Sequence, residues 1–224
     1  LAAVSSVLAL LLLLLGLGET VRADAGILYV AMDGDDLQTC DSVANRCRTI
    51  QRAVSAAQAG DEIRIASGTY TGTQTIPSLH TTTLTATQVV AITKTVALRG
   101  GYEPTFADPP NPIGRETIID ASGDGRAVLI VGAAIRPTVE GLVLRGGDAT
   151  GLGGYSTSGP DAGGGLYVRA PTTIRHCTIV SNTASRENPG YGGGVYITYD
   201  DDVTLEGCIL ANNVGSSGAR GRGG

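Results

Sequence analysis

The stretch from Gly163 to Val214 contains the same pattern twice, and this repetition decides the fold. Gly163-Gly164-Gly165-Leu166-Tyr167-Val168 recurs as Gly192-Gly193-Gly194-Val195-Tyr196-Ile197. Thr173-Ile174-Arg175-His176-Cys177-Thr178-Ile179 recurs 31 residues later as Thr204-Leu205-Glu206-Gly207-Cys208-Ile209-Leu210, and Asn182 recurs as Asn213. Self-similarity with a period of about 30 residues is typical of a stacked, quasi-linear solenoid rather than a closed domain.

Two fainter copies lie upstream of this pair. Thr138-Val139-Glu140-Gly141-Leu142-Val143-Leu144 aligns with the segment that starts at Thr173. Leu98-Arg99-Gly100-Gly101 resembles Leu144-Arg145-Gly146-Gly147. The second alignment predicts that Arg99 and Arg145 occupy equivalent positions and stack on one outer face.

The repeats are made of strands. Their apolar residues come in short bursts that Gly, Asn and Pro separate, whereas a helical repeat needs runs of ten or more residues with 3.6-residue spacing. The 33 glycines among 224 residues suit the corners that such a coil must turn. Asn182 and Asn213, recurring in register, predict a hydrogen-bonding ladder inside a turn. The sequence therefore predicts an all-β solenoid of short stacked strands.

The segment from Thr49 to Gly60 interrupts the strand pattern and predicts a short helix. Thr49 is a suitable N-cap and Gly60 a suitable residue just beyond the C-terminus. The end of a solenoid exposes strand edges and core, so we expect this helix to cap the N-terminal end, with Gln51 and Arg52 in solvent. Its apolar face would contact the first rung through residues with helical spacing: Ile50, Ala53, Val54 and Ala57.

Residues 1–25 are predicted to be a secretory signal peptide. Val7 to Leu17 is an almost unbroken apolar run that is short for a bilayer span, and Ala23-Asp24-Ala25 matches an A-x-A cleavage pattern. A retained membrane anchor is the alternative. After residues 1–25 we expect an N-terminal cap over residues 26–70 and solenoid repeats over residues 71–224, with the sequence ending inside a repeat.

Charge and cysteine content favour a secreted or cell-surface protein that does not bind nucleic acid. The net charge of −5 is spread along the chain and offers no basic patch. Four cysteines fit an oxidising compartment. Cys40 and Cys47 flank a short polar loop and are predicted to form a disulfide. Cys177 and Cys208 occupy equivalent repeat positions and are predicted to stack as free thiols, with a bridge between them as the alternative.

These features together resemble the opening of secreted right-handed parallel β-helix proteins of the pectin-lyase-like superfamily. The resemblance rests on Tyr29-Val30, Cys47-Arg48-Thr49-Ile50-Gln51-Arg52-Ala53, Gly60-Asp61-Glu62-Ile63 and Ala66-Ser67-Gly68-Thr69-Tyr70. The Gly-Gly-Gly-x-Tyr blocks resemble repeats of the polymorphic outer-membrane-protein type. The resemblance implies a right-handed parallel β-helix with a short N-terminal capping helix, a fold that hosts lyases, hydrolases and adhesins alike.

The search for a metal or catalytic site finds few candidates. Asp200-Asp201-Asp202 is the densest acidic run. Alternate side chains of a strand point the same way, so Asp200 and Asp202 are the pair that could share a calcium ion, and a solvated turn is the alternative. Asp33-Gly34-Asp35-Asp36 lacks the downstream Glu of an EF-hand and is expected to be a turn. We therefore assign no catalytic, cofactor-binding or metal-binding residue.

The remaining ionisable and aromatic residues are scattered over the repeats. His80 and His176 are the only histidines, and neither is flanked by a catalytic motif. His176 is expected to be an exposed strand residue. Tyr167 and Tyr196 are expected to stack, either as core or as a platform for a sugar. The carboxylates are expected to lie on separate turns, mostly in solvent: Asp120, Asp148, Asp161 and Glu187.

Two hypotheses for function follow. Regular repeats without converging ionisable residues favour a non-catalytic secreted or cell-surface scaffold, adhesin-like, that binds an extracellular polysaccharide or cell-surface ligand. The resemblance alone favours the alternative, an extracellular polysaccharide lyase or glycoside hydrolase whose site lies in the long loops or beyond residue 224. A lyase of this kind needs an acidic cluster with a basic residue, and a hydrolase needs paired carboxylates.

Overall fold

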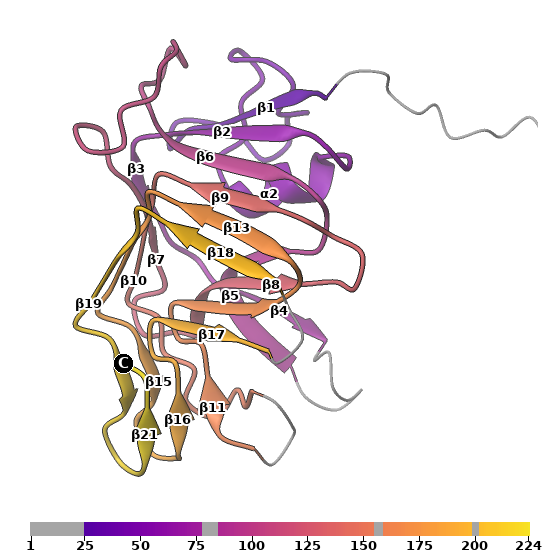
Figure 1. Ribbon diagram of the computed structural model, residues 1–224. Coiled ribbons are helices and arrows are strands. Elements are labelled where there is room, and N and C mark those ends of the chain that lie inside the picture. The colour runs from indigo at the N-terminus through magenta and orange to yellow at the C-terminus, as the bar shows by residue number, and fades with distance from the viewer. Residues whose placement is uncertain (1–24, 78–84, 155–158, 199–201) are drawn as a thin grey trace, which may run out of the picture.

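The computed structural model describes residues 25–77, 85–154, 159–198 and 202–224. Three sheets form the body (Figure 1), and the chain visits them in turn. Sheet A consists of β1 (Ile27–Val30), β2 (Glu62–Ala66), β6 (Ala97–Tyr102), β9 (Thr138–Glu140), β13 (Thr172–Arg175) and β18 (Val203–Glu206). Sheet B consists of β3 (Gly68–Tyr70), β7 (Thr117–Asp120), β10 (Leu142–Arg145), β14 (Thr178–Val180) and β19 (Ile209–Ala211). Sheet C consists of β4 (Gln74–Pro77), β5 (Thr85–Ile92), β8 (Arg126–Val131), β12 (Leu166–Arg169) and β17 (Val195–Ile197).

Two smaller sheets lie beside this body, between sheets B and C along the chain. They comprise β15 (Thr183–Ser185) with β20 (Val214–Ser216), and β11 (Asp161–Ala162) with β16 (Gly190–Tyr191) and β21 (Gly221–Arg222). Among the described strands, each pair is parallel except β4 with β5. The protein is thus mostly β, with parallel sheets in a β-helix-like arrangement.

The strand register confirms the repeat alignment in its strong parts. Ile174 pairs with Leu205, as the 31-residue offset predicts. Thr138 pairs with Thr173, as the fainter copy predicts. Leu166 pairs with Val195, at the shorter offset between the glycine triplets.

The alignment of Leu98 with Leu144 is wrong. Arg99 lies in sheet A and pairs with Glu140, whereas Arg145 lies in sheet B and pairs with Asp120. The two arginines therefore do not stack. Leu98-Arg99-Gly100-Gly101 lies within β6, whereas Leu144-Arg145 ends β10 and Gly146-Gly147 follow it.

His176 lies at a corner of the coil, between sheets A and B. Between sheets A and B the chain takes a left-handed backbone conformation at Gly141 (φ 67°), His176 (φ 51°) and Gly207 (φ 60°). His176 is therefore a corner residue rather than a strand residue, although its side chain is exposed as predicted. The corner positions favour glycine because a side chain is strained at positive φ.

The asparagine ladder lies just beyond sheet B. Asn182 is fully buried, and its Nδ2 donates to Leu144 O at 3.0 Å and to Asn213 Oδ1 at 3.0 Å. Its Oδ1 accepts from Gly147 N at 2.8 Å. Since these contacts join three successive turns, the predicted ladder is confirmed.

Side chains stacked in register fill the inside of the coil. In sheet A the inward stack runs Leu28, Ile63, Leu98, Val139, Ile174 and Leu205. All of these are at most 5% exposed except Leu205 on β18. Equivalent stacks in sheets B and C belong to the same core cluster. Because each stack position is filled once per turn, the period-2 pattern of the short strands is enough to specify the core.

The helix α2 (Ile50–Ala56) packs beside β1, β2 and β5. As predicted, Thr49 caps it, accepting from Arg52 N at 3.2 Å. The predicted apolar face is buried: Ile50, Ala53, Val54 and Ala57. The helix ends earlier than expected, because the capping residue Ala57 is already extended and Gly60 belongs to the next turn.

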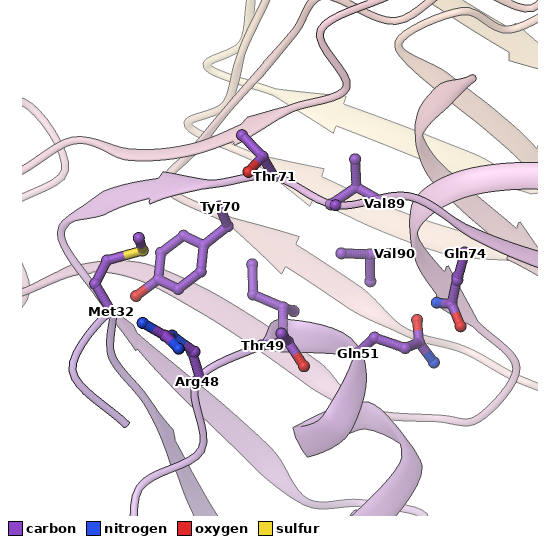
Figure 2. A pocket seen from close by; sticks show the side chains of 11 residues that line it. Met32, Arg48, Thr49, Gln51, Tyr70, Thr71, Gln74, Val89 and Val90 are labelled. Atoms are coloured by element: carbon purple, nitrogen blue, oxygen red, sulfur yellow. The ribbon is translucent and has the colours of Figure 1, made fainter. Parts of the chain in front are cut away.

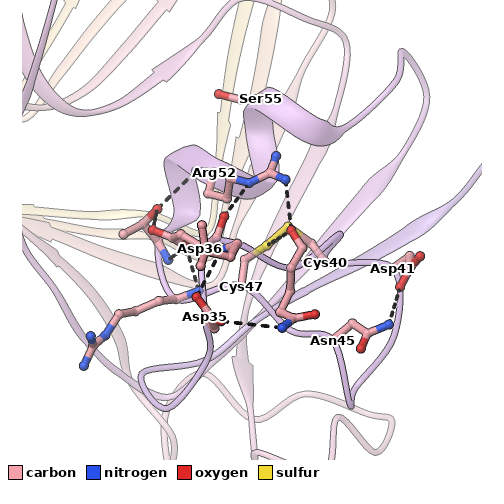
Figure 3. Close-up of a disulfide and its surroundings, with 12 residues drawn as sticks. Asp35, Asp36, Cys40, Asp41, Asn45, Cys47, Arg52 and Ser55 are labelled. Atoms are coloured by element: carbon pink, nitrogen blue, oxygen red, sulfur yellow. Dashed lines mark hydrogen bonds between the residues drawn. A yellow bond between two sulfur atoms is a disulfide. The ribbon is translucent and has the colours of Figure 1, made fainter.

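The expectation that Gln51 and Arg52 lie in solvent is wrong. Gln51 Oε1 accepts from Ala91 N at 2.8 Å, so this side chain satisfies a backbone donor of β5. Arg52 donates to Asp36 O and to Gln38 O, each at 2.9 Å (Figure 3). Both half-buried side chains hold the helix to neighbouring segments. The helical pattern of the sequence assigns the two residues to the polar face but does not reveal these partners.

The disulfide between Cys40 and Cys47 is present, with 4.9 Å between the Cα atoms. Both residues are fully buried, and the segment just before Cys40 is held against α2 because Arg52 donates to Gln38 O (Figure 3). The preceding acidic loop is a turn, as expected. Asp36 accepts from the backbone N–H groups of Arg48 and Thr49, each at 2.9 Å.

Replacing both Cys40 and Cys47 with alanine is expected to lower the free energy of unfolding by about 2–3 kcal/mol, the loop-entropy cost of a seven-residue separation. Urea denaturation measures this. Cys208→Ala is the matched control, since Cys208 is a free, half-buried thiol, and we expect a change below about 1 kcal/mol. Equal effects of the two changes would contradict a stabilising bridge.

Candidate functional site

Two long loops that follow sheet B bring acidic and basic side chains together. Residues 146–154 and 159–163 lie beside residues 183–191, joined by a bridge between Asp148 and Thr183 and by the pairing of β11 with β16. The second segment contains β15 and β16. In the described residues, this region brings two of the predicted carboxylates, Asp148 and Asp161, together with basic and polar partners.

Asp148 is held by the loop that follows it and by Arg186. Its Oδ1 accepts from Thr150 N at 2.9 Å, and its Oδ2 forms an ion pair with Arg186 Nε. The carboxylate is only 8% exposed, whereas the arginine side chain is 64% exposed. Asp148 was expected to lie in solvent. That expectation is wrong, because the neighbouring repeat supplies Arg186 and covers it.

Asp161 is buried more deeply. Its Oδ2 accepts from Ser185 Oγ at 2.7 Å and from Asn188 Nδ2 at 3.2 Å, and its Oδ1 accepts from Gly153 N at 3.0 Å. It is 2% exposed, so the expectation of an exposed carboxylate is wrong here as well. All its partners belong to the two loops. The carboxylate therefore ties these loops together, as buried polar groups require.

Arg126 is a buried cation that the sequence search missed. Its Nε donates to Ala162 O at 3.0 Å, and its guanidinium lies 5.1 Å from the centroid of the Tyr167 ring. Burial lowers the pKa of Arg126 to about 10. Tyr167 stacks on Tyr196 as predicted, at 5.4 Å between ring centroids, and is 3% exposed. It belongs to the core rather than to a platform for a sugar.

The hollow beside this network is open and polar. It has a volume of about 330 Å³, and its lining includes Asp124 and Asp148. Glycoside hydrolysis needs one carboxylic acid that stays protonated and one ionised carboxylate. Burial acts to raise the pKa of Asp148, but the hydrogen bonds from Thr150 and Arg186 outweigh it and leave the pKa below its usual value. Asp148 is thus ionised at neutral pH and unsuited to the role of general acid.

Acid is expected to destabilise the protein through Asp148 and Asp120. Asp120 resembles Asp148: burial opposes ionisation, but hydrogen bonds from Arg145 and Ser122 lower its pKa. A carboxyl group whose pKa is lower in the folded than in the unfolded protein stabilises the fold at pH values above the unfolded-state pKa of about 3.9. This stabilisation is lost as the pH falls through the folded-state pKa.

The free energy of unfolding should therefore fall between about pH 5 and pH 2, and Asp148→Asn should flatten this dependence. Urea titrations of both proteins at several pH values measure it. A parallel loss of stability in the wild type and the variant would contradict the assignment.

Opposite charges compensate each other on the outer face of sheet A. Arg64, Arg99, Glu140, Arg175 and Glu206 follow one another in register across β2, β6, β9, β13 and β18. Arg99 lies 3.3 Å and Arg175 lies 3.5 Å from Glu140. Cross-strand pairs of this kind support a sheet and leave little net field for a charged ligand.

The other predicted residues have separate positions. Asp120 accepts from Ser122 N at 2.8 Å, as expected for a turn. Glu187 is exposed as expected. His80 and Asp200 lie outside the described residues, so the calcium expectation is not tested. Among the described part of the chain, no three His, Cys, Asp or Glu side chains are placed to hold a metal ion.

Cys177 and Cys208 are both free, as favoured from the sequence. They immediately precede the paired strands β14 and β19, and Ile209 N donates to Cys177 O at 2.9 Å. Hydrogen bonding to Cys208 and burial raise the pKa of the Cys177 thiol.

No helix within the described ranges is long and apolar enough to span a membrane. No family model matches the chain, and no curated protein matches it. One solved structure with similarity is a rhamnogalacturonan lyase, with 11% identity and a TM-score of 0.31. The match covers 89% of this chain and 62% of the lyase chain, so this chain spans less than two thirds of that length. At this level the likeness identifies neither an activity nor a site.

Proposed function

We propose that this protein is an extracellular, non-catalytic scaffold built as a right-handed parallel β-helix. In this proposal it is an adhesin-like protein whose loops present a surface to an extracellular polysaccharide or another cell-surface ligand. The signal-like segment at residues 1–25 and the Cys40–Cys47 disulfide support export to an oxidising compartment.

The observation that carries the proposal is that charged side chains contact other protein groups rather than converging on an open site. Proton abstraction or glycosidic cleavage requires an acid and a base that converge on a substrate and are free to act. Several carboxylates of the described coil instead form structural contacts. Asp161 ties two loops together, Asp148 is ion-paired with Arg186, and Glu140 bridges Arg99 and Arg175.

One observation favours the second candidate, a glycoside hydrolase. Asp124 and Asp148 line the same open hollow beside the long loops. This is where the alternative of a polysaccharide-cleaving enzyme would place its chemistry. The lowered pKa of Asp148 leaves it only the role of the ionised carboxylate, so this alternative requires a general acid other than Asp148.

Incubation of the purified protein with pectate, rhamnogalacturonan and alginate tests the proposal. We expect no new reducing ends and no unsaturated products, while a glycan array or pull-down detects binding of an extracellular polysaccharide or cell-surface glycan. Cleavage that Asp148→Asn or Asp124→Asn abolishes would contradict the scaffold and establish the enzyme. Glu187→Gln is the matched control, since Glu187 is exposed and lies outside the hollow.

A further inference from the structure

A second pocket lies between the start of α2 and strands β3 to β5 (Figure 2). Its volume is about 300 Å³, which is within the range of small-molecule sites. Apolar groups form its middle: Ile50 from the helix, the Tyr70 ring, and Val89 and Val90 from β5. Tyr70 donates its hydroxyl to Ala66 O at 2.9 Å, so it offers the pocket mainly its ring.

A cation without a partner stands at one end of this pocket. Figure 2 shows Arg48 beside Met32 and Tyr70. Its guanidinium has no ion pair or hydrogen bond with the described part of the chain, and it is the one charged side chain among the described lining residues. Many other arginines lie within salt-bridge distance of a carboxylate: Arg46, Arg64, Arg99, Arg115, Arg145, Arg175 and Arg186.

An amide without a partner stands at the other end. Gln74 on β4 points its side chain toward the pocket beside Gln51 (Figure 2), and its buried Nε2 has no hydrogen-bond partner. Gln51 already uses its Oε1 to accept from Ala91 N. A buried donor without an acceptor costs free energy that a bound acceptor would recover. The two ends therefore offer a cation and an N–H donor, with an apolar section between them.

We propose that this pocket binds a small aromatic monocarboxylate that carries a hydrogen-bond acceptor opposite its carboxylate. The carboxylate pairs with Arg48, whose planar guanidinium suits two parallel hydrogen bonds. The ring packs between Ile50, Tyr70 and Val90, and the far substituent accepts from Gln74 Nε2. This inference stands apart from the proposed scaffold function, since it uses none of the loops that follow sheet B.

Calorimetric titration with 4-hydroxybenzoate, which carries the carboxylate, the ring and a distal hydroxyl, tests this assignment. We expect saturable binding with one site. Arg48→Ala should weaken it by about ten- to a hundredfold, the range for a charge-assisted contact. Gln74→Leu should weaken it about fivefold, as a single neutral hydrogen bond would. Arg48 is exposed, so its replacement should leave thermal stability unchanged.

Arg169→Ala is the matched control, because Arg169 is also exposed, lacks a side-chain partner within the described residues, and lies on β12 outside this pocket. It should bind as the wild type does. The neutral analogue 4-hydroxybenzamide should bind at least tenfold more weakly than the carboxylate. The proposal is overturned by an absence of binding, by equal affinity for both analogues, or by wild-type affinity in Arg48→Ala.

Discussion

Replacing Asn182 with alanine is expected to lower the free energy of unfolding by about 3–5 kcal/mol. The side chain is fully buried and makes hydrogen bonds to Leu144 O, Val180 O, Asn213 Oδ1 and Gly147 N. Its removal leaves several buried groups on three turns without partners. Urea or thermal denaturation measures the loss.

Asn213→Ala is the matched control for this change. Asn213 occupies the same position of the next repeat, and it donates to Ile179 O at 2.8 Å, but it is only half-buried. Its replacement removes one acceptor of Asn182, but Asn182 Nδ2 keeps Leu144 O and Val180 O as partners and solvent reaches Asn213, so we expect a smaller cost of about 1–2 kcal/mol. Equal costs at the two positions would show that the ladder does not hold the turns together.

Replacing Gly164 with alanine is expected to cost more than about 3 kcal/mol or to prevent folding, because overpacking against a backbone cannot be relieved by a rotamer change. A Cβ atom at this position would lie 2.1 Å from Thr183 O and 3.0 Å from Gly193 O. Both are backbone atoms on neighbouring segments. The middle residue of the glycine triplet thus permits the close approach of adjacent turns.

Gly151→Ala separates this steric effect from the general cost of losing a glycine. Gly151 has a φ of +73°, and no atom lies within 4 Å of a Cβ placed there. We expect about 1 kcal/mol, the cost of a left-handed conformation in a residue with a side chain. Scanning calorimetry measures the melting temperatures of both variants. Equal melting temperatures for Gly164→Ala and Gly151→Ala would contradict the close packing at Gly164.

The coil was predictable because its information is local and repeated. Once Thr173 is aligned with Thr204, the period of two along each short strand assigns Ile174 and Leu205 to the inside, and the register confirms this. The recurrence of Asn182 as Asn213 likewise signalled the ladder. Such periodic features need no knowledge of the tertiary structure.

The candidate site was not predictable in the same way. Asp148 and Asp161 are buried by Arg186, Ser185 and Asn188, which belong to a loop of another turn and occur once each. A residue that is not repeated gives no register, so its partner cannot be inferred from a period. Arg126 carried a weak signal, as a charge at the start of the apolar strand β8.

The spacing of the turns tests the central claim, a stack of rungs in register, most directly. Ile27 is related to Thr173 by four strand steps of sheet A and to Thr204 by five. Spin labels would be placed as the pairs 27 with 173 and 27 with 204, in a protein lacking the free thiols of Cys177 and Cys208. Steps of about 4.8 Å give backbone separations of about 19 Å and about 24 Å. Pulsed electron paramagnetic resonance should find the second distance longer than the first by about 5 Å. Two equal distances, a reversed order, or a difference above about 10 Å would contradict the in-register stack.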